Sequence, residues 1–116
     1  MLQVSGIIGI SGKTPVDEVR GDKGGSFFNF VVVSSDPDTG KKTSYNASMW
    51  VPEKERVKWR EELQGGHVFH MQLGYWVMQP YDGGKYPIPK LKVNRYSLKR
   101  MTTPYWFKAT EGDKDG

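Results

Sequence analysis

One short helical segment lies among runs of residues typical of β-strands, and this order restricts the fold more than any other feature of the sequence. The run "PEKERVKWREELQGG" (residues 52–66) starts with a proline, which suits the first turn of a helix, and ends in two glycines, which stop one. The runs on either side are rich in aromatic and β-branched residues, as strands are. We therefore predict an all-β fold with a single helix of about three turns.

Five strands are predicted around this helix, three before it and two after it. They cover residues 2–12, 26–36, 43–51, 67–79 and 88–98. The polar segment 13–25 indicates a loop or an irregular hairpin, and the glycines of the first strand suit a strand that bends. This order matches the OB-fold, a five-stranded Greek-key barrel with the helix between strands 3 and 4. We assign it to residues 1–100 and expect residues 101–116 to form a partly flexible tail.

Composition excludes several classes of function. The chain has 116 residues, which fits one domain, and it has no cysteine, so disulfides, thiolate zinc sites and a cysteine nucleophile are ruled out. No apolar run approaches the roughly 20 residues that span a bilayer, and we expect a cytoplasmic protein without membrane contact. The only histidines, His67 and His70, are three apart on a predicted strand, where they would face opposite sides. We expect no metal, no cofactor and no enzymatic activity.

Several runs resemble the bacterial and phage single-stranded DNA-binding proteins. "LQVSGIIGISGKTP" is similar to the opening strand of that family, and "GGSFFNFVVVSSD" to its second strand. "YNASMWV" is placed like the third strand, and "LQGGHVFHMQLGYW" like the helix end, the turn and the fourth strand. The resemblance covers about residues 2–98 and rests on order and spacing more than on identity, as for a divergent member.

The resemblance implies a protein that binds single-stranded DNA largely without sequence specificity, in replication, recombination or repair. It also implies a homo-oligomer, a dimer or tetramer, with replication or recombination proteins as further partners. Members of the family usually end in an acidic tail closed by a Pro-Phe pair. This chain ends in "EGDKDG", which is acidic but lacks that pair.

Positive charge gathers in the later part of the chain. The formal net charge is +4, yet residues 63–108 hold one acid, Asp82, against seven basic residues. Aromatic residues make up 13% of this polar chain, so we expect some rings to lie on the surface. Single-strand binding needs cations along the phosphates and rings on which bases stack.

Candidate binding residues follow from this combination. Trp50 alternates with Asn46 and Ser48, and Trp76 with Gln72, so each is predicted on a polar strand face. Tyr81 and Tyr86 flank the turn "DGGK". The predicted stacking residues are Tyr45, Trp50, Trp76, Tyr81 and Tyr86, and the predicted phosphate contacts are Lys41, Lys42, Lys85, Lys90, Lys92 and Arg95.

Other interpretations of these residues stay open. Each tryptophan also suits a corner of the barrel core or an oligomer interface, and the two tyrosines suit turn packing. Phe27, Val31 and Val33, which alternate with core positions, are consistent with an interface between copies. An RNA-binding OB module would use the same surface, and a protein-interaction OB module would use the aromatic residues without nucleic acid.

Overall fold

The fold is taken from a computed structural model that describes residues 2–79 and 87–107. The elements in chain order are β1 (Leu2–Ile10), β2 (Asp17–Arg20), β3 (Ser26–Ser35), β4 (Lys42–Val51), the 3-10 turn η1 (Glu53–Glu55), α1 (Arg56–Glu62), β5 (Val68–Gln79), β6 (Ile88–Val93), the 3-10 turn η2 (Arg95–Ser97) and β7 (Leu98–Met101). Strands pair in the order β1-β3-β4-β6-β5, and β5 pairs back with β1, which closes a barrel. The β4–β6 pair is parallel, and the other barrel pairs are antiparallel.

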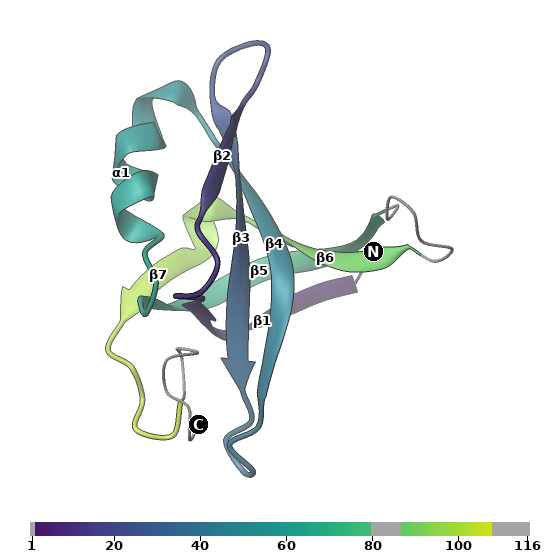
Figure 1. The fold of residues 1–116 in the computed structure, drawn as a ribbon, viewed down its shortest axis with the longest axis vertical. Helices are drawn as coiled ribbons and strands as arrows, with labels where there is room; N and C mark the ends of the chain where they lie inside the picture. Colours follow the sequence, from purple (N-terminus) through teal and green to yellow (C-terminus); the bar gives the residue numbers. More distant parts are fainter. Residues whose placement is uncertain (1, 80–86, 108–116) are drawn as a thin grey trace.

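This closed five-stranded barrel is of the OB type, so the predicted fold class is confirmed. The helix α1 connects β4 to β5, which are the third and fourth strands of the barrel. The short strand β2 pairs with β3, so segment 13–25 forms part of an irregular hairpin, and β7 pairs with β5 beyond the barrel. Figure 1 shows the long β3–β4 ribbon crossing the strands β1 and β5 at a steep angle, with α1 to one side.

The core forms because inward positions alternate with outward ones along each strand. On β3, Phe28, Phe30 and Val32 all lie in the main core cluster, as their spacing predicts. The helix adds Trp59, and Leu63, which directly follows the helix, joins the same core cluster.

A β-bulge in β5 reverses the alternation that the sequence predicts. Met71 pairs with Gly6, but Gly74 pairs with Val4, so β5 has one more residue than β1 between these pairs. Beyond the bulge, Trp76 packs against the core, whereas Leu73 is 37% exposed. The prediction that Trp76 lies on the face opposite the core is therefore wrong.

Candidate nucleic-acid interface

The outward side chains of β3, β4, β6 and β5 form a continuous surface, which we call the outer face. Strand register places four of them in one row across the sheet. Asn29 pairs with Ser48, Ser48 pairs with Lys92, and Lys92 pairs with Tyr75. Phe27 and Trp50, which also pair with each other, lie next to this row along β3 and β4. Polar, cationic and aromatic side chains therefore alternate over one surface.

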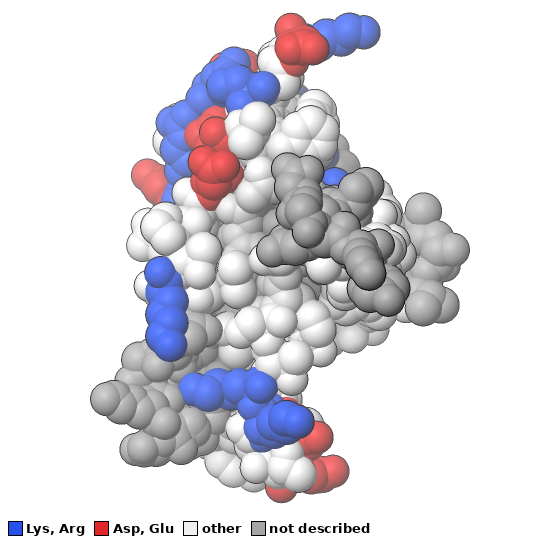
Figure 2. All heavy atoms as spheres, turned by 45° about the vertical axis from the view of Figure 1, so that its right-hand side comes forward, with Lys and Arg blue, Asp and Glu red and all other residues white. Residues whose placement is uncertain are grey.

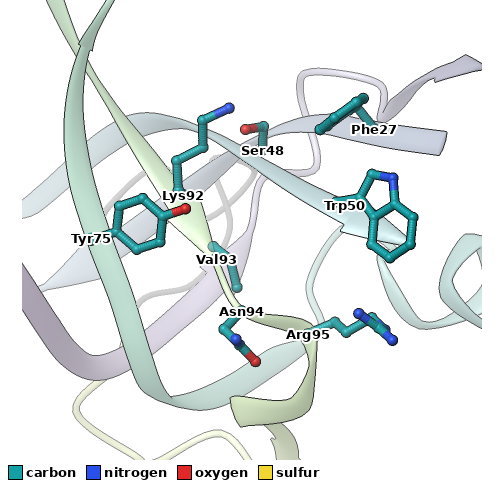
Figure 3. A pocket seen from close by; sticks show the side chains of 8 residues that line it. All are labelled: Phe27, Ser48, Trp50, Tyr75, Lys92, Val93, Asn94 and Arg95. Carbon is teal, nitrogen blue, oxygen red and sulfur yellow. The ribbon is translucent and has the colours of Figure 1, made fainter. Parts of the chain in front are cut away.

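A concave region of about 260 Å³ opens on the outer face. We call it the Trp50 hollow, and Figure 3 shows its aromatic rings and cations arranged around the end of β6. Its lining consists of Phe27, Ser48, Trp50, Tyr75, Lys92, Val93, Asn94 and Arg95. Three aromatic rings from three strands thus surround one space that also contains polar groups.

Trp50 is 44% exposed and is held in place from two sides. A Cβ atom at position 25 would come within 3.1 Å of the indole ring and 2.8 Å of the Val51 carbonyl oxygen. The φ angle of Gly25 is +74°, which also favours glycine at this position. The Arg95 guanidinium lies 5.4 Å from the ring centroid, within the range of a cation–π contact. Because Arg95 also donates to Glu55 (Nε to Oε1, 3.1 Å), the indole is fixed from the backbone and from an ion pair.

Two lysines project from β6 onto the outer face. Lys90 and Lys92 alternate with the core residue Leu91, as predicted, and neither forms an ion pair within the described residues. Burial lowers the pKa of Lys90, and the nearby charge of Lys92 lowers it further. Lys90 donates to the Asn29 Oδ1 atom at 3.0 Å, and the Lys92 Nζ atom lies 5.9 Å from the centroid of the Phe27 ring. Because the ammonium groups of Lys90 and Lys92 repel each other, an anion bound between them would offset this repulsion.

A second concave region, of about 230 Å³, continues the outer face around Lys90. Asn29, Asn46 and Val31 line it from β3 and β4, and the segment 14–17 forms its far wall. That wall contributes one carboxylate, Asp17. The two concave regions lie on neighbouring rows of the same strands, so both open on the outer face.

The end of the barrel near α1 has a different electrostatic character. Glu18 accepts from Arg56 Nε and Arg60 Nε, each at 2.6 Å, and from the Ser26 hydroxyl. Glu53 binds Arg20 and Arg56. We call these residues the arginine–glutamate cluster, and Figure 2 shows acidic and basic side chains intermixed at the end that carries α1.

The arginine–glutamate cluster stabilises the charged form of its carboxylates. The hydrogen bond from Arg60, followed by that from Ser26, lowers the pKa of Glu18 from 4.5 to about 2. The backbone N–H of Gly25 donates to Glu53 and is the main cause of the lowered pKa of that carboxyl. These acids already have cationic partners, so the cluster has little charge left for a ligand.

The structure brings together some of the predicted site residues and separates others. Trp50, Lys92 and Arg95 meet at the Trp50 hollow, and Lys90 lies on the adjoining row. Tyr45 and Trp76 instead lie against the core, where their rings meet edge-on with centroids 5.1 Å apart.

The remaining candidates lie further away or outside the described residues. Lys41 and Lys42 are at the opposite end of the β3–β4 ribbon, about 26 Å of strand from Trp50. Tyr81, Lys85 and Tyr86 lie outside the described residues.

Five residues of the Trp50 hollow are not among those predicted to bind, namely Phe27, Ser48, Tyr75, Val93 and Asn94. Period-two alternation with Phe69 and Met71 would put Tyr75 on the core face, and the bulge turns it outward. In the sequence, Ser48 indicates only that Trp50 shares a polar strand face. Phe27 is 43% exposed, as its alternation predicts, but the sequence indicates an interface between copies for it and not a binding role. Of the other residues in that proposed interface, Val33 is only 1% exposed, so it offers no outward surface.

Comparisons with known proteins do not identify a family for this chain. No protein-family model matches the sequence, and no curated protein matches it either. Within residues 2–79 and 87–107, no three acidic or histidine side chains gather in a way that could hold a metal ion. In the same part of the chain, no helix is long and apolar enough to cross a membrane.

Proposed function

We propose that this protein binds single-stranded DNA across the outer face, largely without sequence specificity. The observation that carries the proposal is the Trp50 hollow, where exposed aromatic rings lie beside a lysine that has no carboxylate partner within the described residues. Stacking on aromatic rings and phosphate contacts are the two contributions that non-specific single-strand binding requires. Neither contribution involves bond making or breaking, so the proposed activity is binding alone.

The arrangement of the outer face supports a defined course for the strand. Bases would stack on Trp50, Phe27 and Tyr75, while phosphates would lie near Lys92 and Lys90. The strand would cross β3, β4 and β6 and continue past Asn29 and Asn46 in the second concave region. We include in the proposal a role in replication, recombination or repair in the bacterial cytoplasm, and assembly into dimers or tetramers.

The proposal is tested by titrating the tryptophan fluorescence of the protein with poly-dT at low salt and at rising salt. Because Trp50 is the tryptophan at the hollow, its emission should be quenched on stacking. The affinity should fall steeply with salt, since bound phosphates release counterions from the strand. Duplex DNA of equal length is the control and should bind much more weakly, and equal binding of both forms would overturn the proposal.

The same titration separates the rival functions. An RNA-binding module would bind single-stranded RNA more tightly than DNA of the same length and base sequence. A protein-interaction module would leave the fluorescence unchanged with either nucleic acid at low salt.

A further inference from the structure

We propose that the Trp50 hollow is a subsite for one nucleobase, in which the Ser48 hydroxyl bonds a carbonyl at the edge of the base. This inference rests on the proposed function, because it assigns a role to one residue within the same outer face. It adds an element of base recognition to a surface whose other contacts, stacking and phosphate binding, are indifferent to sequence.

The Ser48 hydroxyl is buried and has no hydrogen-bond partner among the described residues. Ser48 is 2% exposed, and its Oγ atom is the only buried side-chain nitrogen or oxygen without a partner in the part of the chain that the structure describes. Buried polar atoms are nearly always paired, so a single exception calls for an explanation. Because Ser48 lines the hollow, its hydroxyl lies next to the space that a ligand in the hollow would occupy.

The register of the strands fixes where the hydroxyl lies. Ser48 sits on β4 between Asn29 of β3 and Lys92 of β6 in the row across the sheet. Figure 3 shows the hydroxyl turned toward Lys92, with Phe27 and Trp50 on the other side. The polar atom therefore lies on the floor of the hollow, and the rings stand around it.

The surroundings favour a base over a phosphate at this position. A base has a flat apolar face and a polar edge, which match the rings of Phe27, Trp50 and Tyr75 and the neutral hydroxyl. A phosphate has no flat face and is better placed near the Lys92 ammonium group. The volume of the hollow, about 260 Å³, agrees with a ligand as small as one base. It is below the range of roughly 300–1,000 Å³ that is typical of sites for drug-sized ligands.

The carbonyl contact is tested with two short oligonucleotides of equal length. One carries thymine, and the other carries 2,4-difluorotoluene, which has the shape of thymine but lacks its carbonyl acceptors. Affinities of both are measured by fluorescence anisotropy for the unaltered protein and for Ser48→Ala. For each protein we take the ratio of its affinity for thymine to its affinity for difluorotoluene. The two bases stack differently, but this difference affects the ratio equally in both proteins, so it cancels when the two ratios are compared.

We expect Ser48→Ala to lower the preference for thymine by about three- to tenfold, the worth of one net hydrogen bond. Ser48→Thr retains a hydroxyl and should retain the preference. Ser44→Ala, an exposed position on the same strand, is the matched control and should change nothing. Ser48→Ala should also fold with an unchanged or higher Tm, since it removes a buried polar atom that lacks a partner.

Each other outcome overturns the inference and identifies the reason. If Ser48→Ala weakens both oligonucleotides equally, the hydroxyl contacts the phosphate or only supports packing. If it leaves both affinities unchanged, Ser48 has no role in binding although the proposed function stands. If the unaltered protein binds neither oligonucleotide, the proposed function and the subsite fail together.

Discussion

The end of the barrel near α1 and the outer face use their positive charges in opposite ways. All five arginines of the chain form ion pairs with glutamates, and three of them belong to the arginine–glutamate cluster. Lys90 and Lys92 on the outer face form no ion pair within the described residues. The planar guanidinium suits fixed carboxylate pairs, whereas a lysine ammonium is a mobile point charge on a long stem.

This difference shows why net charge alone is a poor guide to a binding surface. The net charge of +4 is small, but three arginines are balanced by glutamates in the arginine–glutamate cluster, and the other two pair with Glu55 and Glu62. The charge that is left for a ligand is therefore carried by lysines, and one of them, Lys92, lies beside the exposed Phe27 ring. Substitutions in the two regions should consequently affect different properties, stability in one and binding in the other.

The largest expected effect is on binding and comes from Trp50. Trp50→Ala should weaken single-strand affinity by about 1–3 kcal/mol, the usual worth of one stacked base, and should remove most of the fluorescence quenching. Its fold should persist, because 44% of the side chain is exposed. Tyr105→Ala provides the control, since that ring is 97% exposed and lies away from the hollow. Equal losses for both variants would show that the hollow is not the binding surface.

The second effect concerns stability and comes from the arginine–glutamate cluster. Glu18→Gln should lower the free energy of unfolding by about 1–2 kcal/mol, because two guanidinium groups lose a charged acceptor. Affinity for poly-dT should stay within about twofold of that of the unaltered protein. Urea unfolding and fluorescence titration measure the two quantities. A large loss of affinity in a protein of normal stability would contradict the division between the two regions.

The third effect is a pH dependence with a defined sign. The pKa of Glu18 is lowered from 4.5 to about 2, so its contribution to stability is complete above pH 4.5. It is lost as the pH falls toward about 2, because the unfolded chain takes up the proton first. Urea unfolding at a series of pH values should therefore show a steeper loss below pH 4.5 for the unaltered protein than for Glu18→Gln. Parallel curves for the two proteins would refute the assignment.

The smallest effect is on the salt dependence of binding. Lys92→Ala should reduce the slope of log K against log salt by about 0.7, which corresponds to one phosphate contact on a single strand. Lys99→Ala removes the same charge from β7, outside the barrel, and should leave the slope unchanged. If both variants lower the slope equally, general charge and not the outer face determines the binding.

The sequence predicts the barrel well because strand order, alternation and the single helix are local properties. Phe28 and Phe30 are in the core, and Trp50 points outward, as period-two alternation requires. The same rule fails for Tyr75 and Trp76, because one extra residue in β5 reverses the two faces of the strand. The sign of that bulge in the sequence is Gly74, an isolated glycine inside the strand that directly follows the extra residue.

The candidate site could be predicted only in part, for a related reason. Lys90 and Lys92 follow from a strand that alternates lysine with Leu91. The pairing of Arg95 with Glu55 joins residues 40 positions apart, and the partnerless hydroxyl of Ser48 depends on three strands at once. Such features arise from tertiary packing, so they become visible only when the barrel is closed.

The most direct test of the proposed binding surface is a two-dimensional ¹H–¹⁵N NMR titration of the protein with a short thymine oligonucleotide. The four tryptophans give four indole N–H signals, of which that of Trp50 is at the hollow and that of Trp59 is in the core. We predict that the Trp50 indole shifts most, together with backbone amides of β3, β4 and β6, while the Trp59 indole stays in place. Shifts that centre on α1 and spare β3, β4 and β6, or no shifts at all, would contradict the account.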